Sequence, residues 1–98
     1  MPINYAAINF LCLQRFLYLV KIWLPSGRLD GQEWVALNPT RHDNRVGSFK
    51  VNTATGKWAD FATNDRGGDP ISLYAYLNNL SQKNAALELQ RKLEGTHG

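Results

Sequence analysis

The first 24 residues form a long apolar segment that few polar side chains interrupt. At 100° per residue, the polar side chains gather on one narrow stripe, and only Asn9 lies opposite. The stripe consists of Asn4, Gln14, Arg15 and Lys21. This periodicity predicts one helix with a single polar edge and a wide apolar face, ended by Pro25, which lacks an amide hydrogen.

Two interpretations of the wide apolar face stay open. The helix packs on a sheet as part of the core, or it also docks on a second copy of the chain or on a further domain. We expect no membrane insertion, because Gln14 and Arg15 lie in the middle of the segment and a central Arg costs about 2.5 to 3.5 kcal/mol. A secretory signal also fits badly, since no basic segment precedes the apolar stretch. We therefore expect a cytoplasmic protein.

Short alternating segments follow and predict a small antiparallel sheet. Residues 33–37 are typical of a strand, and residues 48–52 and 57–62 predict a hairpin in which Gly56 supplies a positive φ. Phe49 and Val51 share one face of their strand, and Lys50 lies on the other. The pattern therefore predicts a half-buried sheet with Lys50 toward solvent.

Two helices are predicted near the C-terminus. Asp69 and Pro70 occupy typical N-cap and first-turn positions, and the inward face of the first helix comprises Ile71, Tyr74 and Leu77. Asn78 and Asn79 end that helix, Ser81 caps the next one, and the second packing stripe is Ala86, Leu89 and Leu93. The order predicts an α+β fold in which a sheet of about three strands is flanked by one N-terminal and two C-terminal helices.

Length and composition allow a single domain without cross-links. The chain has 98 residues, of which 44% are hydrophobic, and a formal net charge of +3. We divide it into an N-terminal apolar helix (1–25), a domain (26–94) and a tail (95–98). Cys12 is the single cysteine, which excludes an internal disulfide and every multi-cysteine zinc site. We therefore expect neither a structural metal nor a cofactor.

The sequence offers little catalytic chemistry. Cys12 lies in the apolar helix and His97 in the tail, so no nucleophile has a histidine partner. A carboxylate metal site of Asp60, Asp65 and Asp69 is disfavoured because Asp69 is better explained as a helix cap. The glycines before it lack the spacing of a phosphate-binding loop and favour a turn. We expect a binding module and not an enzyme.

Basic and aromatic residues alternate through the middle of the chain. The basic ones are Arg28, Arg41, His42, Arg45, Lys50, Lys57 and Arg66, and the aromatic ones are Trp34, Phe49, Trp58 and Phe61. Such a mixture suits a strand of nucleic acid, because cations follow phosphates and exposed rings stack on bases. The alternative is a solvated surface of mixed charge with its aromatic rings in the core, since acidic residues match the basic ones in number between residues 28 and 69.

Four short motifs occur in an order that is typical of one protein family. They are NPTRHD (38–43), GSFKV (47–51), WADFA (58–62) and GDPISL (68–73). Together they resemble the zinc-ribbon domain at the N-terminus of bacterial and phage DNA primases. That family carries a C-P-x-H segment, a P-S-F-x-V strand, an aromatic-x-C-F-x-C strand and a G-D-x-I helix start. Residues 23–73 are also similar to the N-terminal segment of large primase and helicase proteins of phages, plasmids and genomic islands.

The departures from this family fall on its zinc ligands. Asn38 stands for the first cysteine, Arg41 or His42 for the histidine, Asp60 for the third ligand, and Thr63 or Asn64 for the fourth. The resemblance therefore implies a zinc-ribbon-like fold without zinc. Its folding energy would come from packing of Trp34 and Trp58, and from hydrogen bonds or ion pairs among Arg41, His42 and Asp60.

The resemblance implies an accessory module that contacts single-stranded template DNA beside the catalytic domain of a primase or helicase. We expect phosphate contacts from Arg45, Lys50, Lys57 and Arg66, base stacking by Trp58, and further contacts from Arg41 and His42. The alternative is a protein-interaction or dimerisation module that has lost DNA binding. In that case residues 3–24 would form the interface of a homodimer.

Overall fold

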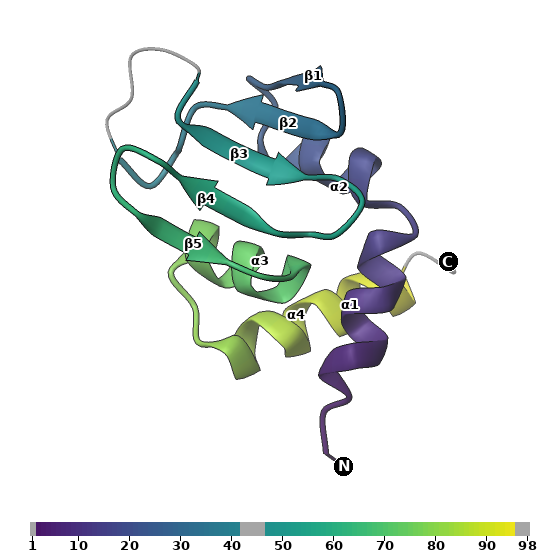
Figure 1. Ribbon diagram of the computed structural model, residues 1–98. Coiled ribbons are helices and arrows are strands. Elements are labelled where there is room, and N and C mark those ends of the chain that lie inside the picture. Colours follow the sequence, from purple (N-terminus) through teal and green to yellow (C-terminus); the bar gives the residue numbers. More distant parts are fainter. Residues whose placement is uncertain (1, 42–46, 96–98) are drawn as a thin grey trace.

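The computed structural model describes residues 2–41 and 47–95 (Figure 1). Within them the chain forms an α+β fold of four helices and five strands. The helices are α1 (Tyr5–Leu13), α2 (Phe16–Trp23), α3 (Pro70–Asn78) and α4 (Gln82–Gly95). The strands are β1 (Arg28–Asp30), β2 (Glu33–Ala36), β3 (Phe49–Asn52), β4 (Trp58–Asp60) and β5 (Asp65–Gly67). The predicted fold class is confirmed.

The sheet is an antiparallel meander in the order β1-β2-β3-β4-β5. The predicted strand at 33–37 and the predicted hairpin correspond to β2, β3 and β4, and Gly56 has the expected positive φ of +81°. The two edge strands, β1 and β5, were not predicted. Each is three residues long and mostly polar, so neither carries an alternating apolar pattern.

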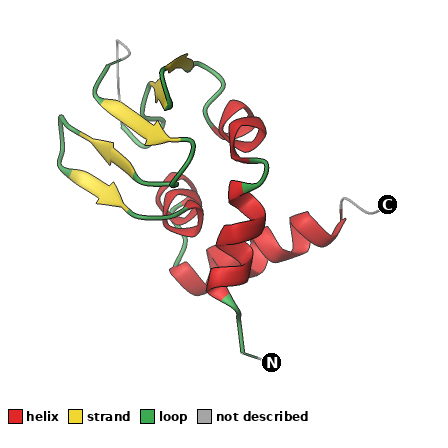
Figure 2. Ribbon diagram, turned by 45° about the vertical axis from the view of Figure 1, so that its right-hand side comes forward, coloured by secondary structure: helices red, strands yellow, loops and turns green. Residues whose placement is uncertain are grey.

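The helices cover one face of the sheet, as Figure 2 shows from the side. Cross-strand pairs place Trp34, Phe49, Val51 and Trp58 on this inner face, where they pack with Phe16 and other side chains of α2. Within residues 2–41 and 47–95, no helix lies over the opposite face of the sheet (Figure 1). This face, on which Val35 is nevertheless only 3% exposed, is called the open sheet face below.

The N-terminal segment is two helices, so the prediction of one continuous helix was wrong. The axes of α1 and α2 differ by 89°, with the break at Gln14 and Arg15. In α1, Ile8 and Cys12 are buried against α3 and α4, whereas Phe16 and Val20 of α2 are buried against the sheet. One straight helix cannot reach both cores, and tertiary packing therefore overrides the local helical periodicity. Side chains of α1 and α2 thus pack with the sheet and with the C-terminal helices.

Caps define both C-terminal helices as expected. Asp69 accepts a hydrogen bond from the amide of Ser72, whose hydroxyl approaches the Asp69 amide in return, which forms a capping box before Pro70. Ser81 accepts a hydrogen bond from the amide of Asn84 at 3.0 Å. Helix α4 continues to Gly95, the first residue of the predicted tail, and residues 96–98 lie outside the described part.

Apolar side chains are exposed along the outer sides of α1 and α2. They are Tyr5, Phe10, Leu11, Leu17, Tyr18 and Ile22. In the described part of the chain, no single helix has the length and apolar character to cross a membrane, and only the bent pair of α1 and α2 meets both conditions, when its two helices are counted together.

Candidate nucleic-acid interface

A row of residues crosses the open sheet face from one edge to the other. Successive cross-strand pairs join Arg28 of β1, Val35 of β2, Lys50 of β3, Ala59 of β4 and Arg66 of β5. Directly opposed residues of antiparallel strands project to the same side, so the three cations share this face. Small or aliphatic residues separate them, and we call these five residues the cationic row.

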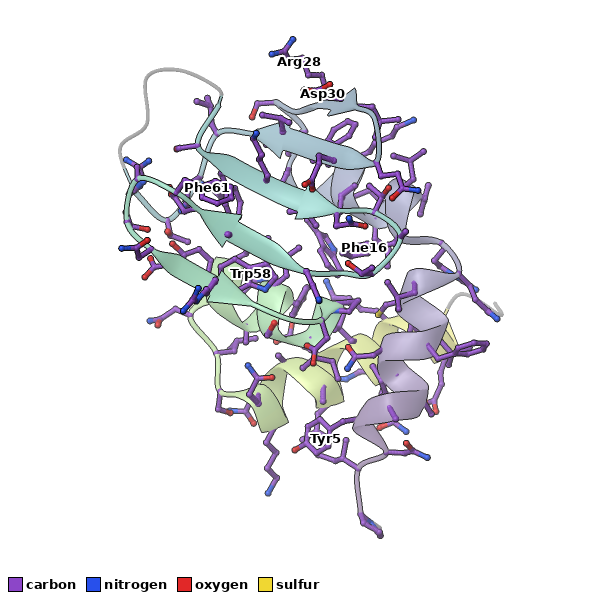
Figure 3. All side chains as sticks on the ribbon, viewed as in Figure 1. Tyr5, Phe16, Arg28, Asp30, Trp58 and Phe61 are labelled. Carbon is purple, nitrogen blue, oxygen red and sulfur yellow. The ribbon has the colours of Figure 1, made fainter. Side chains whose placement is uncertain are left out.

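The aromatic ring of Phe61 lies beside the cationic row. Phe61 follows β4, and its amide donates a hydrogen bond to the carbonyl of Ser48 at 2.8 Å, which extends the ladder beyond the strand. Phe61, which is labelled in Figure 3, is 68% exposed. The ammonium of Lys50 lies 5.9 Å from the centroid of its ring. This pair places a cation and an exposed aromatic surface next to each other on the open sheet face.

The structure contradicts base stacking by an exposed ring of Trp58. Trp58 points to the inner face and is 5% exposed. Its ring packs edge-on against Phe49, and its centroid lies 4.6 Å from that of the Tyr76 ring. Its Nε1 donates a hydrogen bond to the hydroxyl of Ser72 at 2.9 Å. The ring is a core element, as was expected in the alternative interpretation of the aromatic residues.

Phe61 replaces Trp58 as the candidate for base stacking. The alternation of side chains between the two faces of a strand could have identified it. Phe61 lies three positions after Trp58, so an extended chain places the two rings on opposite faces. The sequence left open which of them faces the core, because that depends on pairing with β3.

Further charges border the cationic row on its two sides. Lys57 is exposed at the end of the β3–β4 turn, where its carbonyl accepts a hydrogen bond from the amide of Asn52. Next to the cationic row on the same face, a second row of cross-strand pairs joins Asp30 of β1, Glu33 of β2 and Asn52 of β3. Its β1–β2 end therefore carries two carboxylates. Among the described residues, the acidic side chains of this face therefore gather at one corner, and the β3–β5 region carries Lys50, Lys57 and Arg66.

Arg41 is held in a buried polar cluster beside the sheet. Its Nε lies 2.8 Å from Oδ2 of Asp60, and its Nη2 donates to the hydroxyl of Ser48 at 3.1 Å. Asp60 is fully buried and also accepts a hydrogen bond from Nδ2 of Asn38 at 2.8 Å. Arg41 therefore has a structural partner, and its assignment as a phosphate ligand loses support.

The cluster controls the ionisation of Asp60. Burial by itself raises the pKa of this carboxyl group, but hydrogen bonds from Arg41, Asn38 and the amide of Ala62 favour the charged form. Together with the positive charge of Arg41, they hold the pKa of Asp60 well below its ordinary value. Asp60 is therefore an anion at neutral pH.

Tyr76 connects this cluster to the edge strand β5. Its hydroxyl accepts hydrogen bonds from Nδ2 of Asn38 at 2.8 Å and from the hydroxyl of Thr40 at 3.1 Å. The same hydroxyl donates to Oδ2 of Asp65 at 2.7 Å. The segment after β2, the last residue of β4, the first residue of β5 and helix α3 are therefore tied together by a continuous polar network.

The positions that the resemblance assigned to zinc ligands meet at Asp60. Asn38 and Arg41 contact its side chain, and the amides of Thr63 and Asn64 donate to its carbonyl at 3.2 and 2.8 Å. The expected ion pair between Arg41 and Asp60 is confirmed, and so is the expected core packing of Trp34 and Trp58. Across residues 2–41 and 47–95, no three His, Cys, Asp or Glu side chains gather as metal ligands would.

Two predicted site residues cannot be placed. His42 and Arg45 lie outside the described residues. Of the remaining candidates, Lys50, Lys57 and Arg66 come together on the open sheet face, whereas Arg41 and Trp58 do not. Arg28 was noted as a basic residue, but its place in the cationic row depends on β1, which has no alternating pattern in the sequence.

Cys12 has no reactive environment. It is fully buried between α1 and the C-terminal helices, and burial raises the pKa of its thiol to about 11, although the nearby charge of Arg15 opposes this. The thiol is therefore protonated at neutral pH.

Comparisons with models of protein families, with curated proteins and with solved structures found no match for this chain.

Proposed function

We propose that this protein is a nucleic-acid-binding module that contacts single-stranded DNA on its open sheet face. The observation that carries the proposal is the alignment of Arg28, Lys50 and Arg66 across the five strands, with the exposed ring of Phe61 beside them. Neighbouring strands lie about 4.8 Å apart, so successive cations of the row are spaced by roughly 10 Å and the row spans about 19 Å. This length matches a few nucleotides of an extended strand.

A single strand suits this surface better than a duplex. The sheet supplies neither a helix nor a protruding ribbon for a groove, and its exposed aromatic ring needs an unpaired base. The ammonium of Lys50 lies 5.9 Å from the centroid of the Phe61 ring. It can therefore neutralise a phosphate while a base stacks on the ring. Recognition of this kind tolerates many sequences, because every base has a π face.

The polar cluster supports the proposed relation to primase zinc-ribbon domains. Two positions that the resemblance assigns to zinc ligands, Asn38 and Arg41, contact the carboxylate of a third, Asp60, and Arg41 supplies the positive charge there. We propose a cytoplasmic accessory module without its own catalytic activity, which works beside the catalytic domain of a primase or helicase. In this role the module holds the template strand, and the partner domain performs the chemistry.

A titration of fluorescently labelled oligothymidylate tests the proposed function. Phe61→Ala is expected to weaken binding by about 1 to 3 kcal/mol, because one stacked base loses its platform. Phe10→Ala is the matched control, since Phe10 is 61% exposed, close to the value for Phe61, and lies on α1, away from the sheet. Equal affinities of the two variants, or no binding of the wild type at low salt, would contradict the proposal.

A protein-interaction or dimerisation module through residues 3–24 is the second candidate function. The observation in its favour is the set of exposed apolar side chains on α1 and α2, which includes Phe10 and Tyr18. Light scattering across a range of concentrations tests this alternative. A stable dimer without DNA binding would favour it over the nucleic-acid interface.

A further inference from the structure

Three adjoining cavities, which share lining residues, form a groove between the N-terminal helices and the C-terminal helices α3 and α4. The first, of about 250 Å³, lies between Ile8 and Leu11 of α1 and Leu93 of α4. The second, of about 260 Å³, lies between Tyr18 and Ile22 of α2 and α4, and shares Arg15 and Leu93 with the first. The third, of about 350 Å³, continues toward Leu77 and shares Ile22, Trp23 and Lys92 with the second. We call this surface the α2–α4 groove.

The side chains of the α2–α4 groove combine an apolar lining with a cationic rim. Arg15 borders the first two cavities, and Lys92 borders the last two. Among the described lining residues the only carboxylate is Glu94, which lies at the far end of the first cavity. The chain has no acidic residue before Asp30, so α1 and α2 contribute positive charge alone.

We propose that the α2–α4 groove binds an amphipathic helix of a partner protein, with carboxylates flanking the apolar face of that helix. Apolar side chains at helical spacing fit a row of linked cavities, as in other helix-in-groove complexes. Acidic flanks would meet Arg15 and Lys92. This proposal rests on the opposite side of the molecule from the DNA interface and is independent of it.

The shape and charge of the groove favour this occupant over two others. A flat bilayer surface does not fill cavities, which here are lined in part by the partly buried Leu93. A second copy of α1 and α2 would bring Arg15 and Lys21 against identical cations, and no carboxylate on those helices would compensate. An acidic amphipathic helix fits the concave shape of the groove and also complements its positive charge.

Two synthetic peptides test the proposal with the full chain. Both are 16-residue amphipathic helices with the same leucine face, and they differ only in whether Glu or Lys flanks that face. The Glu peptide is expected to bind about tenfold more tightly, through two rim contacts. Arg15→Glu is expected to reverse this preference or abolish it, and negative charge is tolerated there because residue 15 precedes the first turn of α2.

Variants on α2 and α4 locate the binding site. Ile22→Glu places a charge in the groove at an exposed position and is expected to weaken binding of the Glu peptide at least tenfold. Leu87→Glu is the control, because Leu87 is exposed on α4 outside the three cavities. Equal affinities of the two peptides, or no binding of either, would overturn the proposal. It would also be overturned by a dimer that Ile22→Glu dissociates, or by binding to phosphatidylserine vesicles that both peptides fail to displace.

Discussion

The fully buried carboxylate of Asp60 lies 2.8 Å from Nε of Arg41, whose side chain is 30% exposed, in the polar cluster that joins β4 to the segment after β2. Asn38 donates a further hydrogen bond to the same oxygen. A buried charge is costly unless it is paired, so removing one partner destabilises more than the pair itself contributes. The Asp60–Arg41 pair therefore fixes the end of the sheet beside which Phe61 lies.

Acidification tests this ion pair. Because the folded pKa of Asp60 is depressed, its stabilising contribution is present above the unfolded pKa of about 4 and is lost as pH falls toward the folded pKa. Below pH 4, the free energy of unfolding of the wild type is expected to fall by up to about 1.4 kcal/mol per pH unit because of Asp60. Asp60→Asn is expected to abolish this part of the slope. Urea unfolding at several pH values measures this slope.

Asp30→Asn is the control for that experiment, because Asp30 is an exposed carboxylate on β1. It is expected to leave the acid slope unchanged. If Asp60→Asn and the wild type lose stability in parallel below pH 4, Asp60 is not the ionised centre of the cluster.

Metal independence is a second prediction. The position of each implied zinc ligand takes part in hydrogen bonds around Asp60, and Arg41 occupies the place where a cation would balance its charge. We expect the melting temperature to be the same with and without a chelator, and elemental analysis to find no stoichiometric zinc. A melting temperature that drops when chelator is added would contradict this account.

The cap of α3 provides a third prediction. Asp69→Ala removes the acceptor for the Ser72 amide and half of the capping box, and is expected to cost about 0.5 to 2 kcal/mol. Chemical denaturation measures the cost, and binding of single-stranded DNA is expected to be unchanged. Loss of DNA binding without loss of stability would make Asp69 a site residue.

A pair of adjacent glycines gives a fourth prediction. A Cβ atom at Gly67 would overlap Nε1 of Trp58 and the hydroxyl of Ser72, which form a hydrogen bond. We expect Gly67→Ala to destabilise the fold by about 1 to 3 kcal/mol, as overpacking does. Gly68→Ala meets nothing within 4 Å and is expected to change stability by less than about 0.5 kcal/mol. Similar urea midpoints for the two variants would contradict the close approach of Gly67 to Trp58.

Local signals explain what the sequence could predict. The alternation around Phe49 and Val51, the glycine at position 56 and the cap at Asp69 each act within a few residues, and each was placed correctly. Arg41 and Asp60 are nineteen positions apart in the sequence, and only the resemblance, which assigns both to implied zinc-ligand positions, predicts that they lie close together.

Long-range packing explains what the sequence could not predict. The break at Arg15 follows from two cores that lie in different directions, and a single periodicity carries no such information. The face on which Phe61 lies depends on the register between β3 and β4. The cationic row also needs β1 and β5, which are stabilised by pairing and not by their own pattern.

The salt dependence of single-strand binding tests the central claim most directly. If the cations of the open sheet face neutralise three or four phosphates, the log-log slope of affinity against salt is expected to be about −2 to −3. Replacing Lys50 and Arg66 together by Ala removes two of these contacts and is expected to flatten the slope by about 1.4. Lys21→Ala with Lys83→Ala removes the same charge from exposed positions on α2 and α4 and is expected to leave the slope unchanged. Equal slopes for the two double variants, or binding that does not depend on salt, would contradict a DNA interface on the open sheet face.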